Sequence, residues 1–252
     1  MATKIALITG STSGIGKATA LYLAKAGYNL IICGRRSDRL IEVSDELSAI
    51  GAKVLVKVLD LRIKADVETF INALPPDWKQ IDVLVNNAGL AAGLSSFADG
   101  DIEDWDEMID TNIKGLLYIS RQVMPLMVET AKGHIINIGS IAGKEIYPNG
   151  NVYCGTKHAV DALTKSMRRE LAEHNIRVTG IHPGAVETEF SLVRFKGDAE
   201  RAAKVYEGFE NLVADDIAEA ILWCISRPSH VNINDLVIMP TAQPAAGFIL
   251  RK

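Results

Sequence analysis

Short, continuously apolar runs alternate with helix-length segments along the whole chain, and this alternation restricts the fold more than any other feature. Apolar residues at almost every position are typical of strands buried on both faces, as in a parallel sheet covered by helices. Strand–helix alternation with right-handed crossovers predicts an α/β fold, a doubly wound, Rossmann-like parallel sheet with helices on both faces. The candidate strands are Lys4–Thr9, Asn29–Cys33, Lys53–Leu59, Val83–Asn86, His134–Ile138, Arg177–Ile181 and Leu236–Met239.

The segments between these strands contain glycine and proline residues at positions where helices typically end or bend. Gly27 and Gly51 stand where two helices should end. The segment 102–130 is long for one helix, and we expect Pro125 to kink it or to mark its last turns. No linker or repeat interrupts the pattern, which favours a single domain over all 252 residues. Residues 189–214 are the least strand-like and are candidates for a substrate lid.

Composition excludes several classes of protein. The formal net charge is −4, so there is no basic excess with which to neutralise a nucleic acid. No apolar run is long enough to span a bilayer and no signal peptide is visible, so we expect a cytoplasmic protein that does not bind membranes. Three widely spaced cysteines indicate reduced, buried thiols, and the histidines show no metal-ligand spacing, so no metal site is expected.

A glycine-rich turn follows the first strand and leads directly into a helix. Glycines permit a sharp turn and the close approach of a pyrophosphate, while the helix N-terminus offers free N–H groups and a positive dipole end. The spacing is Gly-x-x-x-Gly-x-Gly rather than the usual Gly-x-Gly-x-x-Gly, but its place at the first strand–helix turn indicates a dinucleotide site. The candidate residues are Gly10, Ser11, Ser13, Gly14, Ile15 and Gly16.

The end of the second strand indicates which dinucleotide binds. An NAD site usually has an acidic residue here, whereas this chain has Arg35 and Arg36. Guanidinium groups grip a 2′-phosphate, so NADP is favoured; a solvated, charged helix start is the alternative. Asp60, beside Leu61, follows the third strand and is placed to accept the adenine amino group, or else to cap the next helix.

Tyr153 and Lys157 are spaced to share one face of a helix. A nearby ammonium favours phenolate and should lower the pKa of Tyr153 towards the working range of an acid/base. Ser140 follows the fifth strand at the sheet edge where such folds bind ligands, and its hydroxyl can stabilise an oxyanion. The tyrosine–lysine spacing alone arises easily by chance, so it is Ser140 and the glycine turn that make it specific for alcohol–carbonyl interconversion.

With these motifs the chain resembles the short-chain dehydrogenase/reductase family over essentially its whole length. The resemblance implies a catalytic tetrad of Asn112, Ser140, Tyr153 and Lys157, in which Lys157 also holds the nicotinamide ribose and Asn112 anchors a water of a proton relay. Without the family, a helix-bending or core amide is the preferred interpretation of Asn112. The other cofactor residues that the resemblance implies are Asn87, Ala88, Gly89, Pro183, Gly184, Val186 and Thr188.

Three stretches, 86–91, 188–198 and 230–234, are similar to the NADP-dependent 3-hydroxy acid dehydrogenases. This group includes serine dehydrogenases and relatives that reduce malonic semialdehyde. The similarity implies a short 3-hydroxy acid substrate such as L-serine or 3-hydroxypropionate, and a homotetramer with contacts through the helices that bear Asn112 and Tyr153. The apolar C-terminal segment Pro240–Lys252 then packs either on a neighbouring subunit or on its own domain.

Arg194, or alternatively Lys196, is a candidate clamp for the substrate carboxylate, since it follows the nicotinamide-binding turn; a surface charge is the competing interpretation. Two other functions compete with the 3-hydroxy acid dehydrogenase. One keeps the chemistry but changes the substrate, as in a 3-oxoacyl-thioester reductase or a broad carbonyl reductase. The other is a non-catalytic NADP sensor, which the presence of both Tyr153 and Lys157 disfavours.

Overall fold

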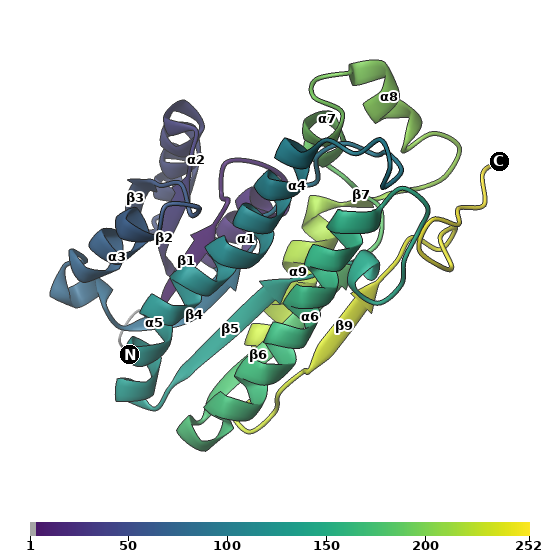
Figure 1. The fold of residues 1–252 in the computed structure, drawn as a ribbon. Helices are drawn as coiled ribbons and strands as arrows, with labels where there is room; N and C mark the ends of the chain where they lie inside the picture. Colours follow the sequence, from purple (N-terminus) through teal and green to yellow (C-terminus); the bar gives the residue numbers. More distant parts are fainter. Residues whose placement is uncertain (1–3) are drawn as a thin grey trace.

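All seven predicted strands are present and form one parallel sheet in the order β3-β2-β1-β4-β5-β6-β9 (Figure 1). A computed structural model describes residues 4–252 of the chain. The doubly wound parallel sheet predicted from the sequence is therefore confirmed. The strands are β1 Ile5–Thr9, β2 Asn29–Gly34, β3 Val54–Val58, β4 Ile81–Asn86, β5 Gly133–Ile138, β6 Ile176–Pro183 and β9 Asp235–Ile238.

Helices cover both faces of the sheet and give the molecule three layers (Figure 1). Alternate strand residues point to opposite faces, so Leu7 joins the core under α3, α5 and α6, while Ile8 joins the core under α1, α2 and α9. This two-sided burial explains why the five inner strands are mostly apolar, whereas the edge strands β3 and β9 are partly exposed. The helices are α1 Gly14–Lys25, α2 Ser37–Ala49, α3 Lys64–Asn72, α4 Ile102–Ile109, α5 Leu116–Thr130, α6 Asn151–Leu171, α7 Phe190–Arg194, α8 Ala199–Lys204 and α9 Ala214–Ile225.

The two predicted glycine stops are confirmed. Gly27 follows α1 with φ +85°, a conformation that side chains disfavour, and its N–H donates to the Ala24 carbonyl at 2.9 Å. The N–H of Tyr28 donates to the Leu23 carbonyl at 3.0 Å, which completes a Schellman motif. Gly51 ends α2 in the same way, with φ +96°.

The long segment 102–130 is interrupted, but not where the sequence suggested. A π-helical turn, η2 Asp110–Gly115, separates α4 from α5 and carries Asn112. Pro125 lies inside the last turns of α5, which is the second of the two predicted alternatives. A π turn is held by tertiary contacts and has no residue signature comparable to proline, so the sequence did not reveal it.

A two-stranded parallel pair, β7 Val186–Glu187 with β8 Leu212–Val213, was not predicted. Each strand has two residues, too few to show an apolar run. The pair brackets α7 and α8, which lie beyond one end of the main sheet in Figure 1. Three 3₁₀ turns complete the fold: η1 Pro76–Trp78, η3 Ile141–Gly143 and η4 Ala172–His174.

Two further expectations concern composition. Cys33, Cys154 and Cys224 are free and buried, as expected. Among the helices of residues 4–252, none combines the length and the apolar character needed to cross a bilayer.

Candidate active site

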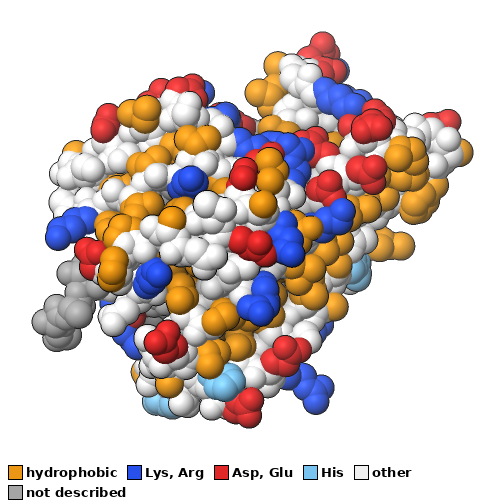
Figure 2. Space-filling model, turned by 60° about the vertical axis from the view of Figure 1, so that its left-hand side comes forward, with side chains coloured by type: hydrophobic (Ala, Val, Ile, Leu, Met, Phe, Trp, Pro, Cys, Tyr) orange, Lys and Arg blue, Asp and Glu red, His pale blue; other side chains and the backbone are white. Residues whose placement is uncertain are grey.

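A cavity of about 680 Å³ opens where the loops after β1, β2, β4, β5 and β6 meet. This is the edge at which open α/β sheets bind ligands. Figure 2 shows the molecule hollowed at its upper edge, with basic side chains beside the hollow. The predicted site residues that line the cavity are Gly10, Ser13, Gly14, Ile15, Arg35, Arg36, Asp60, Leu61, Asn87, Ala88, Gly89, Ser140, Tyr153, Lys157, Pro183, Gly184, Val186, Thr188 and Arg194.

Two predicted residues of the glycine turn lie behind the cavity wall. The Ser11 side chain is fully buried, and its hydroxyl donates to the Ile8 carbonyl at 2.7 Å. Gly16 faces the turn itself, where a Cβ would overlap the Gly10 carbonyl oxygen. Both residues therefore shape the turn rather than line the cavity.

Asn112 is the third predicted residue outside the cavity lining. Its Oδ1 accepts from the Leu90 N–H at 2.8 Å, and its Nδ2 donates to the Leu90 carbonyl at 2.8 Å. The same Nδ2 donates to Thr156 Oγ1 at 3.0 Å, one residue before Lys157 on α6. The amide thus connects the π turn, the loop after β4 and α6 behind the residues predicted to be catalytic.

The glycine turn has the geometry of an anion cradle. Gly10 and Gly14 have φ values of +66° and +52°, which glycine adopts readily. The Asn87 side chain donates to the Thr9 and Gly10 carbonyls at 2.9 and 3.0 Å and so fixes the turn against β4. The N-cap residue of α1, Ser13, makes no side-chain capping bond, so the N–H groups at the start of the helix are available to a phosphate.

The two predicted arginines point to different partners. Arg36 Nη2 donates to Thr12 Oγ1 at 2.8 Å and to Ser13 Oγ at 2.9 Å, which holds its guanidinium on the glycine turn. Its Nη1 donates to Glu189 Oε2 at 2.7 Å. Arg35 instead approaches Glu107 at 3.5 Å. Arg36 is therefore the arginine that shares the turn with the predicted phosphate-binding residues.

Asp60 lines the cavity and does not cap α3, whose N-cap residue is Ile63. Its carboxylate accepts from Arg62 Nη2 at 2.7 Å and from Arg62 Nε at 3.0 Å. These bonds hold the pKa of Asp60 below its ordinary value, so the group is an anionic acceptor at neutral pH. The capping alternative is wrong, while the predicted contact with adenine stays a prediction.

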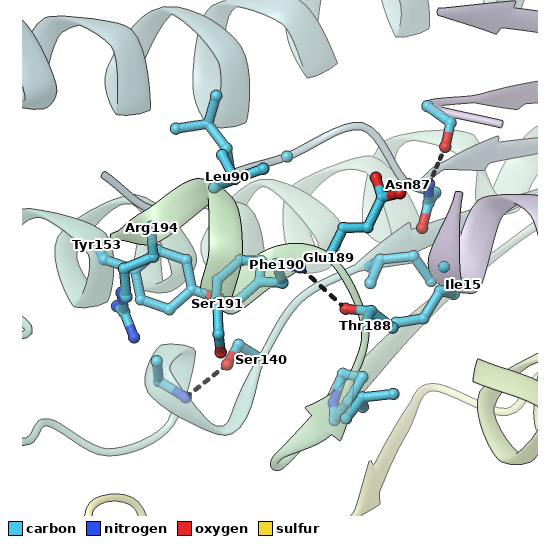
Figure 3. Close-up of a pocket in the computed structure, with 18 of the residues that line it drawn as sticks. Ile15, Asn87, Leu90, Ser140, Tyr153, Thr188, Glu189, Phe190, Ser191 and Arg194 are labelled. Carbon is cyan, nitrogen blue, oxygen red and sulfur yellow. Dashed lines mark hydrogen bonds between the residues drawn. The ribbon is translucent and has the colours of Figure 1, made fainter. Parts of the chain in front are cut away.

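Ser140, Tyr153 and Lys157 come together from β5 and α6, and Figure 3 shows Tyr153, Ser140 and Arg194 at one end of the cavity. Ser140 Oγ accepts from the Ala142 N–H at 3.1 Å, which orients the hydroxyl. Lys157 Nζ donates to the Ile138 carbonyl at 2.9 Å. Burial lowers the pKa of Lys157 to about 8.

The pKa of Tyr153 is shifted in the direction opposite to the prediction. Burial raises it, with a smaller contribution from the neighbouring Tyr147, while Arg194 and Ser140 act in the opposite direction. Lys157 Nζ lies 6.0 Å from the centre of the Tyr153 ring, whereas the guanidinium carbon of Arg194 lies at 4.9 Å. Desolvation of the phenol therefore outweighs the groups that favour phenolate, and the cation among these groups is Arg194 rather than Lys157.

Arg194 presents an anion-binding group next to Tyr153. Its Nη2 donates to the Tyr147 hydroxyl at 2.6 Å, and its guanidinium also lies over Phe190, 5.5 Å from the ring centre. Its Nε is buried and has no hydrogen-bond partner. Within residues 4–252 no carboxylate lies within ion-pair distance of Arg194, whereas Lys196 pairs with acidic groups outside the cavity. A half-buried guanidinium without a carboxylate is suited to an anionic ligand.

The cavity also contains residues that the sequence did not reveal. Tyr147 and Glu189 contact predicted site residues but lie in irregular segments, where no periodicity marks them. The C-terminal segment packs on its own domain, the second of the two predicted alternatives. Gln243 Oε1 accepts from the Ala185 N–H at 2.8 Å, and the Arg251 guanidinium donates to the Val205 carbonyl at 3.1 Å.

One cluster of potential metal ligands lies outside the cavity. Asp161, His182 and Asp235 come from α6, β6 and β9, with ligand atoms within 4.8 Å of one another. Lys144 Nζ lies 2.6 Å from Asp161 and 3.4 Å from Asp235, so both carboxylates already have a cationic partner. Linear spacing did not reveal this cluster, because its members are brought together only by the sheet.

Known proteins resemble the chain over nearly its full length. The short-chain dehydrogenase family model matches residues 4–198. NADP-dependent 3-hydroxy acid dehydrogenase YdfG of Salmonella typhi is 48% identical over 249 residues, which cover 98% of this chain and 99% of that protein. Sulfoacetaldehyde reductase 2 of Chromohalobacter salexigens is 44% identical, with 97% of each chain covered. A closed form of serine dehydrogenase complexed with NADP⁺ matches with a TM-score of 0.93 at 45% identity, covering 98% of this chain and 99% of that one.

Proposed function

The chain belongs to the short-chain dehydrogenase family, and from this premise we propose that it is an NADP-dependent dehydrogenase of short 3-hydroxy acids. Relatives that carry such names match the chain over nearly their full length. The single observation that supports the substrate class is the position of Arg194. This half-buried guanidinium lies 4.9 Å from the centre of the Tyr153 ring and has no carboxylate partner among the described residues. It supports a substrate whose carboxylate lies a short distance from its hydroxyl carbon.

The residues around the cavity fit NADP. The proposed contacts are the α1 N-terminus with the pyrophosphate, Arg36 with the 2′-phosphate, Asp60 with adenine and Thr188 with the carboxamide. Lys157 is proposed to hold the nicotinamide ribose. When bound, NADP supplies or accepts the hydride.

Tyr153 is proposed to move the proton at the substrate oxygen. Because burial raises its pKa, the phenol is protonated at neutral pH and can donate its proton to a carbonyl oxygen as the hydride arrives. In the reverse direction the proton of the alcohol must pass to the phenolate form of Tyr153, which regenerates the phenol. Ser140 is proposed to hold the substrate oxygen by a hydrogen bond. Asn112 supports both from behind, through its bonds to Leu90 and Thr156.

A substrate panel tests this function. Absorbance of the reduced nicotinamide should rise when NADP⁺ is mixed with L-serine or 3-hydroxypropionate, and it should fall when NADPH is mixed with malonic semialdehyde. Sulfoacetaldehyde belongs in the panel because its sulfonate offers Arg194 another anion, and one relative carries that name. Matched neutral alcohols such as 1-propanol should react much more slowly, because nothing in them pairs with the guanidinium. Equal rates with acids and neutral alcohols would contradict the proposal.

Two larger-scale features belong to the same proposal. Residues 189–214 form a lid over the substrate, which is supported by the cavity-lining positions of Phe190, Ser191 and Tyr206.

The chain assembles as a homotetramer, as the family resemblance implies. Light scattering should then give a mass near four times 27.3 kDa.

A further inference from the structure

Glu189 forms an ion pair with the arginine proposed to bind the cofactor's 2′-phosphate. Its Oε2 accepts from Arg36 Nη1 at 2.7 Å, although the two residues are far apart in the chain. Arg36 follows β2, on the adenosine side of the cavity, whereas Glu189 stands at the start of the lid as the N-cap residue of α7. Both line the cavity, so this ion pair joins two parts of its wall that are far apart in the chain.

The remaining contacts of Arg36 leave one edge of the guanidinium for an anion. Nε and Nη2 both donate to Thr12 Oγ1, at 3.2 and 2.8 Å, and Nη2 also donates to Ser13 Oγ at 2.9 Å. These hydroxyls belong to the glycine turn and are neutral. Nη1 is therefore the nitrogen of Arg36 that binds a charged group, and that group is the Glu189 carboxylate.

The Glu189 carboxylate has the charge and the acceptor geometry by which guanidinium groups bind phosphates. Arg36 holds the pKa of Glu189 below its ordinary value, and the Ser13 hydroxyl adds to this effect. The group is therefore an anion across the neutral range. Figure 3 shows its side chain extending from the segment between Thr188 and Phe190.

We propose that Glu189 competes with the 2′-phosphate of NADP for Arg36 and thereby weakens and tunes the affinity of the chain for this cofactor. The inference rests on the proposed role of Arg36. A phosphate that reaches Nη1 must displace the carboxylate or lie beside it, and two anions on one guanidinium repel each other. Glu189 also begins the lid, so its release from Arg36 accompanies entry of the cofactor and its return favours departure.

The expected effect is moderate because both side chains are partly exposed, at 44% for Arg36 and 38% for Glu189. Charge pairs at the surface are screened by water and salt. Removing one charge close to a phosphate should therefore change a dissociation constant by about threefold to tenfold at low salt. The change should shrink as the ionic strength rises towards 0.5 M.

The test is the substitution Glu189→Gln, which keeps the shape of the side chain but removes its charge. Calorimetric titration of the whole protein gives Kd for NADP⁺ and NAD⁺ without relying on turnover. Glu189→Gln should bind NADP⁺ about threefold to tenfold more tightly, with a smaller change for NAD⁺, which lacks the 2′-phosphate. The control is Glu187→Gln, because Glu187 carries the same charge but contacts Asn211 and not Arg36. It should leave both constants unchanged.

A fragment of the cofactor distinguishes competition for Arg36 from an effect of the lid on the nicotinamide end of NADP. The nucleotide 2′-AMP carries the phosphate in question and lacks nicotinamide, so Glu189→Gln should tighten its binding too, and should not tighten that of 5′-AMP to the same degree. If folded Glu189→Gln binds NADP⁺ or 2′-AMP no more tightly than the wild type, the inference is overturned. If the wild type itself binds NAD⁺ as tightly as NADP⁺, the proposed role of Arg36 fails, and the inference fails with it.

Discussion

At the scale of single residues, the sequence predicts which side chains line the cavity but not their electrostatic environment. Ser140, Tyr153 and Arg194 all line the cavity, as their positions in the chain suggested. The direction of the pKa shift of Tyr153 could not be predicted in the same way. It depends on burial and on Tyr147, whose position near the phenol is set by loop packing. Spacing along a helix says which groups are neighbours, but not how much water surrounds them.

Replacement of Tyr153 by Phe should abolish turnover while leaving the cofactor site intact. The ring would still pack against Phe190, at a centroid distance of 5.6 Å, but no proton could be exchanged with the substrate oxygen. We expect kcat to fall by about 10²–10⁴-fold, the usual contribution of general acid–base catalysis. Stopped-flow or steady-state kinetics measure kcat, and calorimetry measures the Kd for NADP⁺, which should stay within about twofold. Near-normal turnover would remove Tyr153 from the mechanism.

Arg194→Gln should raise KM for acidic substrates by about tenfold to a hundredfold, the equivalent of one lost charge-assisted hydrogen-bonding group. The slow reaction with a neutral alcohol of equal length should change little. Lys196→Gln is the matched control, because Lys196 pairs with Asp101 and Asp104 outside the cavity. An unchanged KM in Arg194→Gln, or an equal rise in the control, would contradict the carboxylate clamp.

At the scale of elements, the sequence predicts those strands and helix ends whose positions follow from local burial and local backbone conformation. The five inner strands were found because burial on both faces requires apolar residues at most positions, and Gly27 because its positive φ favours glycine. The π turn 110–115 and the β7–β8 pair were missed. Their backbone geometry depends on distant partners, such as the bonds between the Asn112 amide and Leu90. Tertiary contacts of this kind leave no periodic pattern in the chain.

The β5–β6 pair makes the fold sensitive to mild acid through His134. Its Nε2 lies 2.8 Å from Thr179 Oγ1, and burial lowers the pKa of His134 to about 3, compared with 6.5 for a free imidazole. Between these values the unfolded chain binds a proton that the folded chain does not, so stability falls as the pH drops. From pH 7 to pH 5 this group should remove about 2 kcal/mol from the free energy of unfolding.

Urea unfolding of wild type and His134→Gln at pH 7, 6 and 5 measures this contribution. Glutamine can keep a hydrogen bond to Thr179 but does not titrate, so the variant should lose about 2 kcal/mol less over the same interval. His182, whose pKa is also lowered by burial, is present in both proteins and cancels in the difference. Parallel pH dependences in the two proteins would show that His134 does not contribute.

At the scale of the whole molecule, one sheet supports both hydrophobic cores. Leu84 belongs to the core on one face and Val85 to the core on the other, so neither core can form without the same strand. The cavity lies at the carboxyl edge of this sheet and takes lining residues from loops of both halves of the chain. This shared framework supports the prediction of a single domain, and it implies that a cofactor bound in the cavity stabilises all of it together.

NADP⁺ should therefore raise the temperature of a single unfolding transition. At a concentration one hundred times Kd, binding adds about 2.7 kcal/mol to the stability of the folded state. For a chain of this length that corresponds to an increase of about 5–10 °C in Tm. Scanning calorimetry with equal concentrations of NADP⁺ and NAD⁺ should show the larger increase for NADP⁺, and Arg36→Ala should remove the difference because it takes away the guanidinium on the glycine turn. Two separate transitions would contradict the single domain, whereas equal shifts in the wild type would contradict the role of Arg36.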